Sequence, residues 1–174
     1  MEIRLLNEAD AESYGHLRLR MLREQPEAFV SSYEEEAPKP LSWTQDRLKA
    51  SELSPVRFVL GAFSDGCLVG SVALSVEERF KQRHKAFLFG MFTAPEERNK
   101  GIGRALLAEC LGRAARVPGL EQVYLTVTGG NAAEQLYASV GFERFGIETR
   151  AIKCDGKYYS KIYMALHLRE PSSR

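Results

Sequence analysis

Cysteine is scarce in this sequence, and the few that occur form no recognisable site. Cys67, Cys110 and Cys154 are widely separated, and no Cys-x-x-Cys occurs. An odd, scattered set supports neither a disulfide framework nor a structural zinc site. The three histidines are equally scattered, and no two have the i, i+4 spacing of a metal-binding pair. We therefore expect no metal cofactor.

An excess of charge of one sign is also missing. Lysine and arginine number 24, aspartate and glutamate number 23, and the formal net charge is +1. Proteins that bind nucleic acid through its phosphates normally carry a basic excess or a basic stripe. We therefore do not expect nucleic-acid binding as a main function.

Long hydrophobic runs are absent as well. The longest apolar runs are only a few residues, against the roughly 20 residues needed to cross a bilayer. Glu2, Arg4, Glu8 and Asp10 interrupt the first 20 residues, which argues against the apolar core of a signal peptide. We expect a cytoplasmic protein with no membrane partner. No repeat, linker or low-complexity stretch divides the 174 residues, so we predict one domain over residues 1–174.

The periodicity of the apolar residues predicts an α/β protein with a mixed, mostly antiparallel sheet flanked by helices. Its predicted order is β-α-α-β-β-β-α-β-α-β-β. Strands are expected near 2–6, 56–62, 68–76, 86–92 and 123–127, and in two further segments that turn at Asp155-Gly156. Helices are expected near 7–25, 42–52, 101–117 and 131–139. The strand at 86–92 is apolar on both faces, and Gly90 inside it predicts a bulge or a close backbone approach.

The most informative stretch follows that apolar strand. Gly101 and Gly103 stand at the start of an amphipathic helix, with Arg98, Lys100 and Arg104 around them. The exposed N–H groups at a helix N-terminus favour anions. Glycine at this point lets a phosphate approach the main chain closely. The stretch therefore predicts a phosphate-binding loop.

Three phosphate-binding patterns were compared with this loop. The Walker A spacing does not occur here. The dinucleotide pattern requires a third glycine, where this chain has Leu106. The pattern Arg-x-x-Gly-x-Gly is present over residues 98–103. A glycine-rich helix entry with solvated charges is the alternative that these residues alone leave open.

Two stretches resemble motifs of the GNAT superfamily of acetyl-CoA-dependent N-acetyltransferases. Residues Leu88–Leu107 resemble its motif A, and Asn131–Phe142, which ends in Leu-Tyr-Ala-Ser-Val-Gly-Phe, resembles a later motif. The element order extends the resemblance over nearly the whole chain. It implies a GNAT-like fold and transfer of an acetyl group from acetyl-CoA to a primary amine, by direct attack in a ternary complex. A coenzyme-binding regulatory module without efficient turnover is the alternative.

The resemblance also implies roles for individual residues. The pyrophosphate would lie on the loop amides, and the pantetheine arm would pair with the end of the bulged strand like an added strand. The implied coenzyme-binding residues are Met91, Phe92, Thr93, Arg98, Asn99, Lys100, Gly101, Ile102, Gly103, Arg104 and Asn131. Tyr137 resembles the family's general acid near the coenzyme sulfur, and a phenol suits protonation of a thiolate. An ordinary packed core tyrosine is the alternative at that position.

The chain departs from the family pattern in two places. Asn131 and Tyr137 are six residues apart, where many relatives have seven. The coenzyme-contacting asparagine therefore corresponds either to Asn131 or to Gly130, and in the second case Asn131 is only a helix cap. Where some relatives carry a glutamate base, this chain has Thr126, which is a poor base at neutral pH. Four other glutamates were considered, and no base is assigned: Glu34, Glu35, Glu77 and Glu78.

The expected partner is a small-molecule or peptide amine. In the family, the region between the first two helices borders the acceptor site, so Phe29, Ser32, Tyr33 and Glu34 are candidate acceptor contacts. The amine itself is not identified by the sequence. The resemblance also admits a homodimer.

Overall fold

The computed structural model describes residues 1–168. Residues 169–174, the end of the predicted domain, lie outside the described residues. In residues 1–168, no helix is both long enough and apolar enough to cross a membrane.

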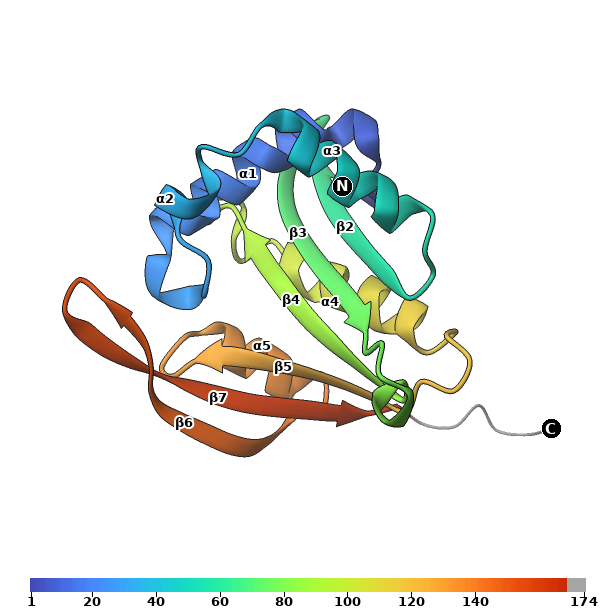
Figure 1. The fold of residues 1–174 in the computed structure, drawn as a ribbon, viewed down its shortest axis with the longest axis vertical. Helices are drawn as coiled ribbons and strands as arrows, with labels where there is room; N and C mark the ends of the chain where they lie inside the picture. The colour runs from blue at the N-terminus through green and yellow to red at the C-terminus, as the bar shows by residue number, and fades with distance from the viewer. Residues whose placement is uncertain (169–174) are drawn as a thin grey trace.

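One mixed sheet of seven strands organises the described chain (Figure 1). The strands are β1 (Glu2–Leu5), β2 (Arg57–Ser64), β3 (Cys67–Val76), β4 (Lys85–Thr93), β5 (Gln122–Thr128), β6 (Glu143–Cys154) and β7 (Lys157–His167). Their order across the sheet is β1-β2-β3-β4-β5-β7-β6. Neighbouring strands are antiparallel except β4 and β5, which are parallel. The predicted fold class is confirmed.

Helices cover both faces of this sheet (Figure 1). They are α1 (Ala11–Glu24), α2 (Tyr33–Glu36), α3 (Leu41–Glu52), α4 (Ile102–Ala114) and α5 (Ala133–Ser139). Helices α1 and α3 pack on one face, and α4 packs on the other with α5 beside it. The buried side of α4 is the apolar stripe that the sequence predicts, including Leu106, Leu107 and Cys110.

The one-turn helix α2 was expected to be part of a loop. Ser32 and Glu35 form a capping box there. The Ser32 hydroxyl accepts a hydrogen bond from the Glu35 N–H at 3.2 Å, and the Glu35 carboxylate accepts one from the Ser32 N–H at 2.9 Å. This pairing satisfies N–H groups that a helix start leaves without partners, so a single turn forms in an otherwise irregular segment.

Strands β4 and β5 pair only at their first residues. The register runs from Lys85 opposite Gln122 to Phe87 opposite Tyr124, and the strands then diverge (Figure 1). Beyond that point, no strand within residues 1–168 pairs with the edge of β4 that faces β5. The apolar residues of β4 are therefore not all core residues, because Phe87 is only partly buried and lines the opening.

The predicted irregularity at Gly90 is a β-bulge. Phe89 pairs with Ala73 and Phe92 pairs with Ser71, so Gly90 and Met91 together oppose a single residue of β3. Gly90 has φ +62°, a left-handed conformation that glycine adopts without strain. The Ser71 hydroxyl donates to the Gly90 carbonyl at 3.1 Å and holds the bulge in place. The bulge turns the end of β4 away from β5.

Candidate functional site

A groove of about 630 Å³ lies at the N-terminal end of α4, and we call it the helix groove. It is lined by Gln25, Met91, Phe92, Thr93, Glu97, Arg98, Asn99, Gly101, Ile102, Gly103, Arg104, Asn131, Ala132, Ala133 and Leu136. These include every predicted coenzyme-binding residue except Lys100. The fold thus brings together residues from β4, the loop before α4 and the start of α5.

The backbone at the start of α4 leaves donors exposed to the helix groove. Asn99 has φ +62° and Gly101 has φ +82°, and these left-handed residues turn the chain into the helix. The first backbone bond of the helix runs from the Ala105 N–H to the Gly101 carbonyl at 3.0 Å. The N–H groups before it have no partner within the helix, so they can donate to an anion.

Gly103 keeps this anion site open. A Cβ atom there would stand 3.3 Å from both Met91 Cε and Leu136 Cδ2. That spacing is tight, so a side chain at this position would fill the groove between β4 and α5. The missing side chain and the exposed N–H groups fit a bound phosphate.

The three basic side chains of the loop have different surroundings. Arg98 donates to the Thr93 carbonyl at 3.3 Å, and Arg104 donates to the Ser139 hydroxyl at 3.0 Å. Neither bond neutralises the guanidinium, so both charges act on the helix groove. Lys100 differs, because its ammonium is paired with the Glu97 carboxylate at 3.1 Å and it does not line the groove.

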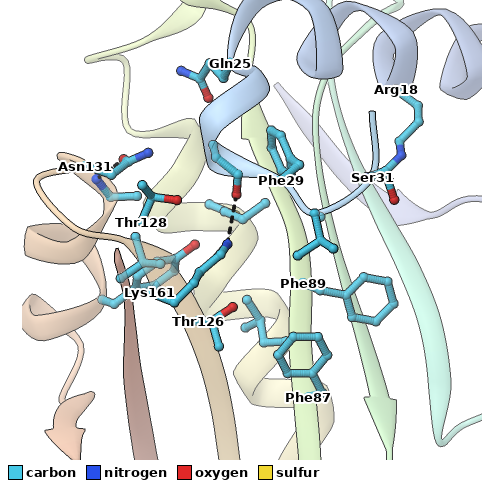
Figure 2. Close-up of a pocket in the computed structure, with 18 residues that line it drawn as sticks. Arg18, Gln25, Phe29, Ser31, Phe87, Phe89, Thr126, Thr128, Asn131 and Lys161 are labelled. Carbon is cyan, nitrogen blue, oxygen red and sulfur yellow. Dashed lines mark hydrogen bonds between the residues drawn. The ribbon is translucent and has the colours of Figure 1, made fainter. Parts of the chain in front are cut away.

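A second cavity of about 280 Å³ lies between the diverging strands β4 and β5, and we call it the strand pocket (Figure 2). It is lined by Arg18, Gln25, Ala28, Phe29, Val30, Ser31, Phe87, Leu88, Phe89, Gly90, Met91, Thr126, Val127, Thr128, Asn131, Ala133, Tyr137 and Lys161. Four of these residues also line the helix groove: Gln25, Met91, Asn131 and Ala133. The two cavities therefore adjoin.

Tyr137 lines the strand pocket and also packs in the core. It is 5% exposed, and its ring meets that of Phe142 edge-on with the centroids 5.9 Å apart. Burial raises the pKa of the Tyr137 hydroxyl above its usual value, with a smaller contribution from Cys110. The hydroxyl therefore keeps its proton at neutral pH and can act as a donor.

Asn131 both bonds to the start of α5 and lines the two cavities. Its Oδ1 accepts a hydrogen bond from the Ala133 N–H at 2.9 Å and so caps the start of α5. It also lines both cavities, and its side-chain NH₂ can donate to a bound group. The carboxylate of Glu134, three residues after Asn131, is paired with Arg144 and does not bond to the Asn131 backbone. Asn131 therefore supports the first turn of α5 from one residue before the N-cap position, which is Ala132, and a coenzyme contact stays a prediction.

The candidate acceptor residues separate in the structure. Phe29 lines the strand pocket, but Ser32, Tyr33 and Glu34 do not. Ser32 caps α2, and the Tyr33 ring lies against the Arg23 guanidinium at 4.3 Å. The neighbouring Ser31, which the sequence analysis did not select, lines the pocket instead.

None of the glutamates considered as a base lines the strand pocket, whose lining residues, all in the described part of the chain, include no Asp or Glu. Glu35 is used in the α2 cap. Glu77 accepts a hydrogen bond from the Tyr124 hydroxyl, near the closed end of the β4–β5 pair. No residue is therefore assigned as the general base that deprotonates the amine.

The sequence analysis missed two basic residues of the strand pocket. Arg18 is buried and forms a two-bond ion pair with Glu36, at 2.9 and 2.7 Å. Lys161 is 6% exposed and donates to the Ala28 carbonyl at 3.3 Å. No sequence signal identifies either one, because a lone basic residue in a helix or strand is normally solvated.

Among the residues that the structure describes, no group of three or more His, Cys, Asp or Glu side chains could hold a metal ion.

The family model described as the acetyltransferase (GNAT) family matches residues 18–142 of the chain. The chain belongs to the GNAT family of acetyltransferases. It is an acyltransferase of the acetyl-CoA-dependent class, and the resemblance found in the two sequence motifs is confirmed.

Curated relatives of this GNAT chain are named as N-acetyltransferases. The L-amino acid N-acetyltransferase AaaT of Escherichia coli K12 is 29% identical over 89% of this chain and 93% of its own length. The N-alpha-acetyltransferase RimI of Mycobacterium tuberculosis is 35% identical over 66% of this chain and 70% of its own.

Solved structures share the fold. A GNAT acetyltransferase from Streptococcus pneumoniae has a TM-score of 0.89 at 24% identity, covering 97% of this chain and 99% of that one. The yncA acetyltransferase from Salmonella typhimurium, solved with acetyl-CoA, has a TM-score of 0.85 at 20% identity, covering 100% and 97%.

Proposed function

We propose that this GNAT acetyltransferase transfers an acetyl group from acetyl-CoA to a primary amine by direct attack in a ternary complex. The helix groove would hold the coenzyme and the strand pocket would hold the amine. The observation that carries the proposal is that the two cavities adjoin and share Met91 and Asn131. A thioester in one cavity can therefore meet a nucleophile in the other.

The residues of the helix groove suit the parts of the coenzyme. The N–H groups of residues 102–104 would bind the pyrophosphate, with Arg98 and Arg104 adding positive charge. Within the described residues, the edge of β4 that faces β5 has no neighbouring strand beyond Phe87, while its other edge pairs with β3. Its backbone groups from Met91 to Thr93 can therefore pair with the pantetheine arm as with an added strand.

Tyr137 is the proposed proton donor. The reaction expels a thiolate, and a hydroxyl that stays protonated at neutral pH can supply the proton that the sulfur needs. The attacking amine must lose a proton in turn. We assign no residue to that step, since no carboxylate lines the strand pocket among the described residues.

The names of the relatives support an amine acceptor, since AaaT is named for L-amino acids and RimI for α-amino groups. A small-molecule or peptide amine therefore remains the expected partner. We also propose a cytoplasmic location, where acetyl-CoA is available. A homodimer stays a prediction of the family resemblance.

The coenzyme assignment can be tested by thermal unfolding with acetyl-CoA. A ligand at a hundredfold excess over its Kd adds about 2.7 kcal/mol to the stability. At roughly 2–4 °C per kcal/mol, Tm should rise by several degrees. Gly103→Glu should abolish the rise, because a carboxylate would then occupy the phosphate position.

Gly112→Glu is the matched control for this experiment. Gly112 lies on the same helix, and a Cβ there would meet nothing within 4 Å. This variant should keep the full rise in Tm. An equal rise with NAD, or no rise with acetyl-CoA, would contradict the assignment.

A further inference from the structure

Lys161 places an ammonium group in the strand pocket without a matching carboxylate. The residue lies on β7, opposite Thr128 of β5, and Figure 2 shows its side chain extending into the pocket toward the segment after α1. It is 6% exposed, and its Nζ donates to the Ala28 carbonyl at 3.3 Å. Among the side chains that the structure describes, none forms an ion pair with Lys161 within 4.0 Å.

The rest of the pocket does not supply the missing negative charge. Its other basic group, Arg18, is already paired with Glu36 at 2.7 Å. Glu148 lies opposite Lys161 on β6, but its carboxylate accepts a hydrogen bond from the Tyr163 hydroxyl and does not line the pocket. A buried charge is costly when it is unpaired. Burial lowers the pKa of Lys161, and the charge of Glu148 offsets this only in part, so an anionic ligand in the pocket would stabilise the ammonium form.

We propose that the acceptor carries a carboxylate next to its amine, as a free α-amino acid does, and that Lys161 binds this carboxylate. The inference rests on the proposed function and names the substrate class of the same site. Lys161 would thereby act as a specificity-determining residue. Its contact would orient the acceptor, so that the amine points toward the junction with the helix groove.

The other lining residues suit such an acceptor. Thr126 presents a hydroxyl group to the same pocket, and this group can donate to a carboxylate. The rings of Phe29, Phe87 and Phe89 offer an apolar surface for the acceptor's side chain. A volume of about 280 Å³ lies at the lower limit of the roughly 300–1,000 Å³ usual for ligand sites, which suits an acceptor as small as an amino acid.

The same arrangement disfavours cationic acceptors. A polyamine or aminoglycoside carries further ammonium groups, which need carboxylates to bind. The lining residues, all within residues 1–168, include no Asp or Glu, and the Lys161 ammonium would repel a second cation. The unpaired lysine therefore selects by repulsion as well as by attraction.

A purely structural role for Lys161 must be separated from this one. Its bond to the Ala28 carbonyl helps to hold the segment after α1 over the pocket, and the Thr128 hydroxyl makes a similar bond to the Glu27 carbonyl at 2.8 Å. Loosening that segment would weaken the binding of every acceptor alike. Loss of a contact with the acceptor's carboxylate would weaken the binding only of acceptors that carry a carboxylate.

The experiment compares acetylation of L-leucine, L-leucinamide and 3-methylbutylamine, read out as release of free coenzyme thiol. Wild type should prefer leucine over the other two in kcat/KM by about tenfold or more, the size expected for a hydrogen-bonded ion pair. Lys161→Met keeps the length of the side chain and removes the charge. It should lower kcat/KM for leucine by about tenfold or more beyond any loss for leucinamide, because leucinamide feels only the lost bond to the Ala28 carbonyl.

Two variants serve as controls. Lys157→Met removes an exposed lysine from the same strand and should match wild type with every acceptor. Thr128→Val loosens the segment after α1 while keeping Lys161. This variant should lower kcat/KM for all three acceptors by the same factor. Equal losses for leucine and leucinamide in Lys161→Met, or no preference in wild type, would overturn the proposal.

A binding measurement separates this proposal from the proposed function. Calorimetry with coenzyme A present would compare N-acetyl-L-leucine with N-acetyl-L-leucinamide, and neither ligand needs turnover. If wild type binds N-acetyl-L-leucine and Lys161→Met does not, the anion site at Lys161 is supported even if no acceptor is acetylated. A lack of acetylation would then count against the proposed function alone. Equal binding of acid and amide by wild type would overturn the Lys161 proposal.

Discussion

The side-chain hydroxyl of Thr128 donates a 2.8 Å hydrogen bond to the main-chain carbonyl of Glu27. This bond attaches the segment after α1 to the end of β5, at the point where β5 has left β4. Lys161, the cross-strand neighbour of Thr128, bonds to the next carbonyl, that of Ala28, at 3.3 Å. Two adjacent strands thus hold the segment that closes the strand pocket, and the pocket's shape depends on both bonds.

Thr128→Val tests the contribution of this attachment. Valine keeps the shape of the buried side chain and leaves the Glu27 carbonyl without its partner. The loss should cost about 1 kcal/mol, and Tm should fall by roughly 2–4 °C. KM for the acceptor should rise while the Tm shift produced by acetyl-CoA stays unchanged. A variant with wild-type Tm and KM would show that the segment is held by other contacts.

The buried ion pair of Arg18 and Glu36 predicts a pH-dependent stability. Burial alone raises the pKa of Glu36, but its bonds and its attraction to Arg18 outweigh that effect and lower the pKa below its usual range. Glu36→Gln removes the charge and leaves the Arg18 guanidinium buried without compensation. We expect a loss on the order of 3 kcal/mol at pH 7, measured by chemical unfolding.

The pH dependence of that loss follows from the direction of the shift. A lowered folded-state pKa stabilises the protein fully above the unfolded value of about 4.3. The contribution is lost as pH falls through the folded-state pKa. The free energies of unfolding of wild type and Glu36→Gln should therefore become equal in acid. Glu96→Gln, which breaks the exposed pair with Arg20, is the control and should change Tm little. A Glu36→Gln loss that is constant from pH 7 to acid would contradict the account.

Tyr137→Phe tests the proposed proton donor. The variant keeps the ring and its contact with Phe142 and deletes only the hydroxyl, so the fold and the acetyl-CoA shift should survive. A positioned proton donor contributes about 10²–10⁴-fold, and we expect kcat to fall at least about tenfold with the Kd for acetyl-CoA unchanged. Because burial raises the pKa of Tyr137, its ionisation should not limit the wild-type rate at mildly alkaline pH. Full kcat in the variant would favour the packed core tyrosine.

Local patterns in the sequence were sufficient to predict the fold and the helix groove. Gly101 and Gly103 predict the start of α4, and the continuous apolar run before them predicts β4, so the loop between the two follows directly. Gly90 indicated the bulge for the same reason, since its effect on the backbone is local. The start of α4, strand β4 and the bulge depend only on residues close together in the chain, so the sequence predicts them.

The strand pocket could not be predicted in the same way. Lys161 becomes a pocket residue only because β7 lies between β5 and β6, which places it opposite Thr128. Arg18 depends on Glu36, a partner on another helix. Of the acceptor candidates, Phe29 lines the pocket, but Ser32, Tyr33 and Glu34 lie one to three residues beyond Ser31, the last lining residue of this segment. Ser32 forms a cap that turns the chain away from the pocket there. Such relationships depend on strand order and long-range pairing.

The most direct test of the central claim measures free coenzyme thiol released from acetyl-CoA as each of a panel of amines is added. The panel should include free amino acids, their amides, peptide N-termini, a polyamine and an aminoglycoside. The account predicts release that depends on the amine, with a matching acetylated product identified by mass. Slow thioester hydrolysis that no amine accelerates would contradict it, and the chain would then be a coenzyme-binding module without turnover.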